Sequence, residues 1–155
     1  NNAVGNPLLN EGPNFLSGHL EVNNEFGGLT LSDQKYDGKI RAKRISNDFE
    51  QLNTVIGIVA TDAPLNRMQL KRMSIMCHGS ISRSIHPSHT PMDGDTIFAI
   101  STSDKNNDVY EEISKLDLTI INSIASDTFS RACNRAIFEA KNIGGKPSWK
   151  DLFEN

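Results

Sequence analysis

The sequence predicts a layered α/β fold, with a sheet whose faces are covered by helices. Two apolar segments of strand length occur, TVIGIVAT at 54–61 and TIFAISTS at 96–103, and each precedes a longer segment whose apolar residues recur at helical spacing. Strands that alternate with one-sided helices are typical of this layered arrangement. At 155 residues the chain is the size of one domain.

The first strand and the helix after it carry the clearest local signals. Residues 54–61 form a continuous β-branched run without alternation, which predicts a central strand covered on both faces. Asp62 is expected to cap the next helix, whose first turn tolerates Pro64. The helical spacing of apolar residues then predicts one amphipathic helix over 64–84.

The rest of the chain surrounds this unit. Small and apolar residues at helical spacing predict a long, closely packed helix over 116–142, which ends before Gly144 and Pro147. Residues 1–50 are rich in Asn and Gly and are expected to form loops and a few short strands around a core made elsewhere. Cys77 and Cys133 lie in the two predicted helices, so we expect buried free thiols and not a disulfide.

Composition and charge argue against several classes of partner. The net charge of −3 provides no basic field for nucleic acid, and no window approaches the ~18 apolar residues of a membrane span. Neither partner is therefore expected. The chain shows no signal-peptide pattern. Because it begins with Asn1 and not with Met, we expect a fragment or a processed product. The sequence does not identify the cellular compartment, and a cytoplasmic location is favoured over secretion.

The dipeptide Asn53-Thr54 is the first candidate for chemistry. A Thr hydroxyl needs a base, and a Thr that begins a chain can use its own α-amine, whose reference pKa is about 7.7 to 8. Such a Thr is exposed when its hydroxyl attacks the preceding carbonyl and breaks the bond. Asn tolerates unusual backbone angles that could present this carbonyl. A Thr before Val-Ile is also an ordinary strand former, and local sequence leaves both interpretations open.

A second cluster lies in the loop before the second strand and contains two histidines and two aspartates: His86, His89, Asp93 and Asp95. The paired carboxylates could orient a nucleophile or hold a proton. With Cys77 and His78 near in sequence the cluster could instead bind a metal, although its spacing is not that of a tight zinc site. The aspartates could equally cap the amides of a turn. Asn2, in NAVG, could donate a hydrogen bond to an oxyanion, but alone it carries little weight.

The combination of these segments resembles a known family. NTVIGIVATDAPL at 53–65 and HPSHTPMDGDTIFAI at 86–100 resemble, in order and spacing, the L-aminopeptidase/D-esterase family of N-terminal-nucleophile hydrolases. This family includes β-peptidyl aminopeptidases and the nylon-oligomer hydrolase. The resemblance covers about residues 1 to 140 and implies a four-layer αββα sandwich, of which this chain would supply the C-terminal part. We expect neither a cofactor nor a bound metal.

The resemblance also implies roles for single residues. Thr54 matches the nucleophile that self-cleavage exposes, so the Asn53–Thr54 bond would divide the chain into an α-fragment part, 1–53, and a β fragment, 54–155. Asn2 matches the Asn at the oxyanion position.

Asp93 and Asp95 match paired acidic positions near the nucleophile and would keep its ammonium and hydroxyl oriented. Family members carry a further sheet half and site residues upstream of NAVG, so the resemblance implies an upstream segment as a partner. It also implies a homo-oligomer.

The predicted function is that of an autoprocessed hydrolase of small peptides, amino-acid amides or esters, acting through an acyl-enzyme on Thr54. An alternative is acyl transfer of the ornithine acetyltransferase type, which also self-cleaves before a Thr and carries D-G-D-T. There a polar stretch follows D-G-D-T, whereas apolar residues follow at 97–100 here, which favours the hydrolase. A non-catalytic homologue or an isolated binding domain is the third possibility, because the upstream part is absent.

Overall fold

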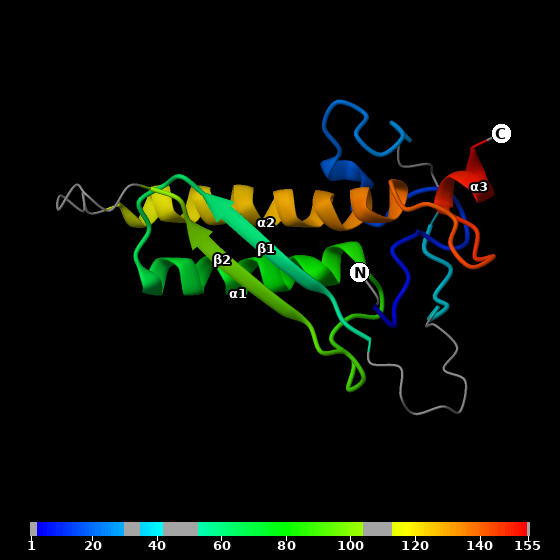
Figure 1. The fold of residues 1–155 in the computed structure, drawn as a ribbon, viewed down its shortest axis with the longest axis horizontal. Helices are drawn as coiled ribbons and strands as arrows, with labels where there is room; N and C mark the ends of the chain where they lie inside the picture. The colour runs from blue at the N-terminus through cyan, green and yellow to red at the C-terminus, as the bar shows by residue number, and fades with distance from the viewer. Residues whose placement is uncertain (1–2, 30–34, 42–52, 104–112, 155) are drawn as a thin grey trace.

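The computed structural model describes residues 3–29, 35–41, 53–103 and 113–154, and the structural statements below concern these. It shows a mixed α/β fold with a small parallel sheet, as the sequence predicted at this level (Figure 1). In chain order the elements are η1 (Gly18–Leu20), β1 (Ile56–Thr61), α1 (Arg67–Ser84), β2 (Thr96–Ser101), α2 (Lys115–Phe138) and α3 (Trp149–Phe153). The second sheet of a four-layer sandwich has no counterpart in the described part of the chain.

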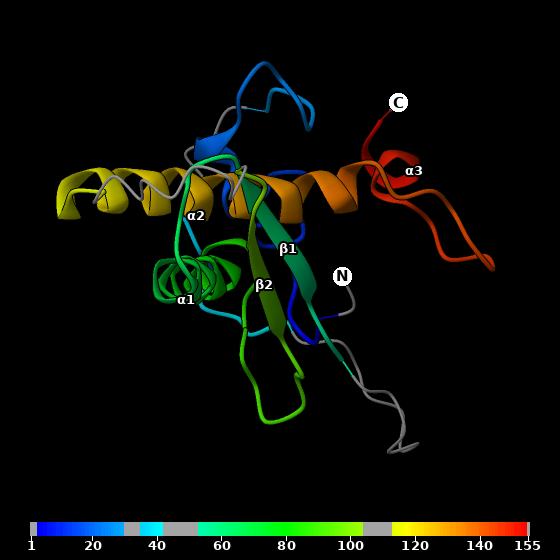
Figure 2. The same cartoon turned by 60° about the vertical axis from the view of Figure 1, so that its left-hand side comes forward.

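The two strands lie side by side and run parallel, with Ile56 opposite Thr96, and α1 forms the connection between them. Exposure alternates along both strands, so only one face of the sheet is packed. Figure 2 shows both long helices on that side. The other face exposes Ile58 by 65% and Phe98 by 53%. The prediction of a central strand covered on both faces is therefore wrong for the described residues, because they provide a cover for one face only.

Helix α1 begins later than predicted because a different residue caps it. The Asn66 side chain accepts hydrogen bonds from the amides of Met68 and Gln69, and the Gln69 side chain accepts one from the Asn66 amide. This reciprocal pair fixes the start at Arg67, so Asp62 is not the cap. The predicted end at residue 84 is confirmed.

Helix α2 ends at Phe138, earlier than the predicted 142, and a short helix that the sequence did not predict follows. After the turn at the two glycines, α3 brings Trp149 against Phe138, with ring centroids 5.0 Å apart, and against Phe15, at 5.7 Å. This aromatic cluster also includes Phe26. Such a contact between distant segments is not visible in the periodicity of a single helix.

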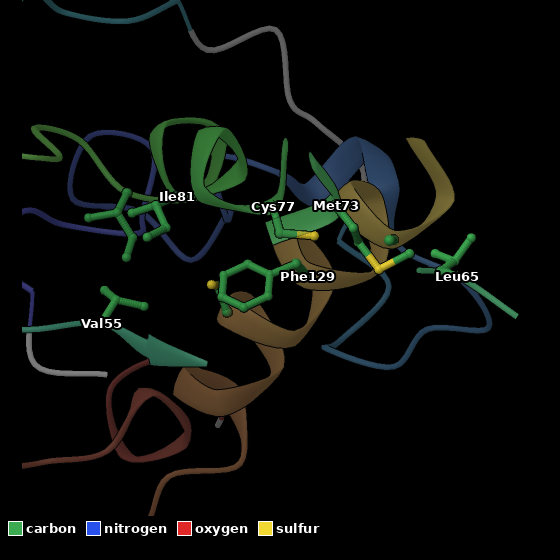
Figure 3. Packing of buried hydrophobic residues seen from close by; sticks show 9 residues of the cluster. Val55, Leu65, Met73, Cys77, Ile81 and Phe129 are labelled. Atoms are coloured by element: carbon green, nitrogen blue, oxygen red, sulfur yellow. The ribbon is translucent and has the colours of Figure 1, made fainter. Parts of the chain in front are cut away.

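The main core lies between the helices and the covered face of the sheet (Figure 3). It is formed by Val55, Leu65, Met73, Cys77, Ile81, Ile85, Ala125, Phe129 and Cys133. Both cysteines are free and buried, which confirms the prediction, and burial raises the pKa of each thiol to about 11. Gly57 allows the close approach of α2, since a Cβ there would lie 2.3 Å from the Phe129 ring.

Helices α1 and α2 pack closely through small polar residues. The hydroxyls of Ser80 and Ser126 lie 2.6 Å apart, and one turn further along both helices Ser84 donates to the Ser130 carbonyl at 3.4 Å. Because the partners advance together, the two helices run in the same direction. The expectation that small residues permit close packing is confirmed.

The described part of residues 1–50 consists of loops, the turn of η1 and isolated bridges, so the expected loops are found but no regular strand. These loops pack along α2, where Arg131 forms an ion pair with Glu25. None of the helices in the described ranges is long and apolar enough to cross a membrane.

Candidate functional site

The parallel pairing of the strands brings the two candidate segments together. Asn53-Thr54 precedes β1 and the Asp93-Gly94-Asp95 segment precedes β2, so both lie at the same end of the sheet (Figure 1). Asn53 and Asp93 form an isolated parallel bridge, and the Gly94 amide donates to the Asn53 carbonyl at 2.8 Å. The strand pairing therefore places the D-G-D segment beside the predicted processing bond.

The hydroxyl of Thr54 lies against the carbonyl that it would attack. Its Oγ1 donates to the carbonyl oxygen of Asn53 at 2.6 Å. Asn53 is only 2% exposed, whereas Thr54 is half-buried. Asn53 is not among the described residues with a positive φ. The Asn53 carbonyl is held instead by pairing with the 93–95 segment of the same chain.

Asp95 binds the backbone directly after Thr54. Its Oδ1 accepts a hydrogen bond from the Val55 amide at 2.9 Å, and its Oδ2 lies 2.8 Å from Nδ1 of His89. The Asp95 side chain is only 4% exposed. His89 adopts a positive φ of 53° and its ring stacks on that of His78 at 4.5 Å. Asp95 is therefore held on both oxygens.

Asp93 is engaged in a different way. Its Oδ2 accepts hydrogen bonds from the amide and the hydroxyl of Thr90, at 2.9 and 2.7 Å, and its Oδ1 accepts one from the Val4 amide at 3.2 Å. Partial burial acts to raise the pKa of Asp93, but the hydrogen bonds from Thr90 and Val4 outweigh it and hold the pKa below its ordinary value. Asp93 thus caps the turn and ties the N-terminal segment to it.

Asn2, the predicted oxyanion donor, lies outside the described residues. Two residues further on, Val4 is bonded to Asp93. Gly5 packs so closely on the loop before β2 that a Cβ there would lie 2.0 Å from the Pro87 carbonyl oxygen. The segment that follows Asn2 is therefore fixed against the D-G-D loop.

Two of the candidate metal ligands, His86 and Cys77, lie apart from the others. The His86 ring contacts Tyr36, with centroids 5.7 Å apart, and Cys77 is part of the apolar core. Within the described ranges, no group of three His, Cys, Asp or Glu side chains could hold a metal ion. The pairing of His89 with Asp95 serves instead to hold the carboxylate.

Sequence reasoning missed the backbone groups of the site and two of its side chains. The Gly94 and Val55 amides carry no signal in residue type, although aligning the two apolar strands in parallel would have placed them. Thr90 lies three residues before Asp93, and this T-x-x-D spacing, in which the acid accepts from the Thr amide as in a capping box, could have been recognised. The sequence suggests His78 only as a metal ligand, whereas in the structure its ring stacks on that of His89.

Two hollows border α1 on the described surface, and Thr54 lines neither of them. One hollow, of about 600 Å³, lies between α1 and β2 and is lined by Leu70, Phe98 and Ser103 among others. A second, of about 460 Å³, is lined by His78 and His89. The second is the nearer to the site, because both histidines contact Asp95.

Comparison with known proteins identifies related sequences. The model of Peptidase family S58 matches residues 9–149. The chain is 34% identical over 107 residues to an uncharacterised aminopeptidase of Mycobacterium tuberculosis, covering 65% of this chain and 31% of that protein. It is 32% identical over 116 residues to one of Mycobacterium leprae, covering 71% and 32% respectively. A 6-aminohexanoate-oligomer endohydrolase of Agromyces sp. is 35% identical over 63 residues, 41% of this chain and 18% of that protein. The chain thus spans about a third of the length of the mycobacterial relatives.

Proposed function

The chain belongs to peptidase family S58, as the sequence resemblance predicted, and on this premise we propose that it carries the nucleophile of an amide hydrolase that cuts its own Asn53–Thr54 bond. One observation supports this most directly. The Thr54 hydroxyl donates a hydrogen bond to the Asn53 carbonyl oxygen at 2.6 Å, so the proposed nucleophile already contacts the carbonyl group that it would attack.

Processing proceeds through an ester. The Thr54 oxygen bonds to the Asn53 carbonyl carbon, the carbon–nitrogen bond breaks, and the hydroxyl proton ends on the released amine. Water then hydrolyses the ester, leaving a carboxylic acid on Asn53 and a free amine and hydroxyl on Thr54. The products are the pieces 1–53 and 54–155.

After processing, Thr54 supplies both nucleophile and base. Its α-amine, with an ordinary pKa of about 7.7 to 8, takes the hydroxyl proton as the hydroxyl attacks a substrate carbonyl. Asn2 stabilises the oxyanion, an acyl-enzyme forms, and water releases the acid. Asp95 keeps the new terminus in place through its hydrogen bond from Val55, while Asp93 fixes the segment after Asn2.

The substrates we propose are small peptides, amino-acid amides or esters. The mycobacterial relatives are named aminopeptidases, and the Agromyces relative is named an endohydrolase of 6-aminohexanoate oligomers. Both names describe cleavage of amide bonds in chains that carry amino groups. The full protein would add an upstream segment that completes the site and the four-layer sandwich, and it would assemble as a homo-oligomer.

The two pieces would stay together after the cut, because they share contacts on both sides of the bond. Arg131 on α2 forms an ion pair with Glu25, which lowers the pKa of that carboxyl. Phe15 stacks on Trp149. The Val4 amide binds Asp93 beside the processing bond itself. These contacts hold the N-terminal piece on the nucleophile-bearing piece without the peptide link.

The test compares the full-length protein with its Thr54→Ala and Thr54→Ser variants. The Ala variant should stay uncut and should lose amide hydrolysis by at least about 1,000-fold, because no hydroxyl remains to form the ester. The Ser variant keeps a hydroxyl and should still be cut. Amide hydrolysis that persists in the Ala variant would require a different nucleophile and would overturn the proposal.

The fate of the acyl group separates hydrolysis from transfer. With an acylated substrate and added ornithine, the proposal expects free acid as the product. Formation of acylated ornithine in place of the acid would identify the acetyltransferase type of reaction instead.

A further inference from the structure

The backbone amide of Gly94 points at the carbonyl of the proposed processing bond. Its N–H donates to the Asn53 carbonyl oxygen at 2.8 Å. A Cβ at residue 94 would lie 3.3 Å from Oγ1 of Thr54 and 3.9 Å from the Asn53 carbonyl oxygen. The Gly94 backbone therefore runs beside the carbonyl of the bond that would be cut, and the lack of a side chain leaves room for the Thr54 hydroxyl.

Two donors meet on this one oxygen in the uncut chain. The Thr54 hydroxyl and the Gly94 amide both donate to the Asn53 carbonyl. When the hydroxyl attacks the carbon, it gives up its own hydrogen bond at the moment when negative charge develops on the oxygen. The Gly94 amide needs no movement to stay bound, and a fixed donor aimed at a developing oxyanion is what stabilises such a transition state.

The residues on either side hold this amide in position. Asp93 is bound by Thr90 and by the Val4 amide, and Asp95 is bound by the Val55 amide and by His89. The peptide between the two carboxylates is thus fixed from both ends to different parts of the chain. The D-G-D spacing therefore has a physical explanation, because the two anchored aspartates lie on either side of the Gly94 amide.

We propose that the Gly94 N–H is the oxyanion donor for cleavage of the Asn53–Thr54 bond, and that Asp93 and Asp95 act as positioning residues for it. The inference rests on the proposed self-cleavage. In this step the Thr54 oxygen bonds to the Asn53 carbon, the carbonyl electrons move onto the oxygen that faces Gly94, and they return as the carbon–nitrogen bond breaks. The released amine takes the hydroxyl proton.

The test removes the donor without adding a side chain. In the full-length protein, glycolic acid replaces Gly94, so that an ester oxygen stands in place of the N–H. The matched control replaces Thr96 by its hydroxy-acid analogue, which removes the N–H that donates to the Val55 carbonyl at 2.9 Å. Each variant loses one ladder hydrogen bond of similar length, and only the first loses a bond to the processing carbonyl.

The readout is the rate at which newly made precursor yields the chain that begins at Thr54, followed by intact mass. The ester at 94 should slow processing by about 100-fold or more relative to the ester at 96, the loss typical for one oxyanion donor. A ratio below about tenfold would overturn the assignment. Wild-type precursor that is never cut would instead contradict the proposed function, so the two failures are distinguishable.

A side-chain variant keeps the test valid if the esters do not fold. Asp93→Asn retains the size of the side chain but accepts more weakly from Thr90 and Val4, so the Gly94 amide should be held less firmly. Processing should slow severalfold while Thr54 and its hydroxyl stay intact. The readout is the processing rate of folded precursor compared with Asp127→Asn, a variant at an exposed ion pair on α2. Equal rates in the two variants would remove the positioning role.

Discussion

The two faces of the β1–β2 sheet differ in how they are covered. On the inner face Gly57 lies so close to Phe129 that a Cβ would be 2.3 Å from the ring, and Val59 packs against the core. On the outer face Ile58 and Phe98 are more than half exposed. Both faces are apolar, but only one has a partner within the described residues.

This difference between the two faces bears on how a strand without apolar–polar alternation is interpreted. A β-branched run with apolar residues on both sides is typical of a strand buried on both faces. Here the chain spans 31% of a relative's length, and the second cover is missing from the described residues. We therefore propose that the outer face packs against the second sheet of the four-layer sandwich, formed in the full-length protein.

The largest expected change in stability tests whether the outer face of the sheet is covered in the full-length protein. In the full-length protein, Ile58→Ala should lower the free energy of unfolding by about 2 to 5 kcal/mol, as truncation of a buried isoleucine does. The matched control is Ile75→Ala, at an isoleucine that is 51% exposed on α1. It should change stability by less than about 0.5 kcal/mol. Urea unfolding measures both, and equally small effects would show that the outer face has no cover.

A smaller effect is expected on the inner face. Gly57→Ala should lower the free energy of unfolding by about 1 to 3 kcal/mol, because the added methyl group must displace the Phe129 ring. Gly79→Ala is the control, since a Cβ at this helical position meets nothing within 4 Å. It should raise stability by up to about 1 kcal/mol through helix propensity. Thermal unfolding compares them, and a Gly57→Ala protein as stable as wild type would contradict the close packing described.

The smallest effect concerns the end of the sheet, where the D-G-D segment lies. The pKa of Asp93 is lowered in the folded protein, so its contribution to stability is present above the unfolded pKa of about 3.9 and is lost as pH falls through the folded pKa. Asp93→Asn should therefore reduce the loss of stability between pH 7 and pH 3. For this partly exposed group the change should be under about 1 kcal/mol. Urea unfolding at both pH values measures it, and an unchanged pH dependence would contradict the hydrogen bonding described.

The order and type of the main elements could be predicted because each has a strong local pattern. The strand near 54–61 and the helix ending at 84 follow from β-branched and helical periodicity, and the two buried thiols follow from their apolar neighbours. The proximity of Thr54 to Asp93 and Asp95 was expected from the family resemblance. The parallel register explains it in physical terms.

Other features depend on contacts that periodicity does not encode. Asn66 and not Asp62 caps α1, because only the Asn66 side chain forms a reciprocal pair with Gln69. Helix α3 exists where Trp149 meets Phe15, a residue more than a hundred positions away in the sequence. The hydrogen bond from Gly94 to Asn53 is made by backbone atoms, so it cannot be predicted from the type of either residue.

In the proposed mechanism Thr54 becomes the first residue of a chain. The most direct test of this step is the intact mass of the purified full-length protein under denaturing conditions, together with the N-terminal sequence of the smaller species. We predict two chains whose junction lies between Asn53 and Thr54, the second beginning with Thr54-Val55-Ile56. A single uncut chain in a preparation that hydrolyses amides would contradict the account.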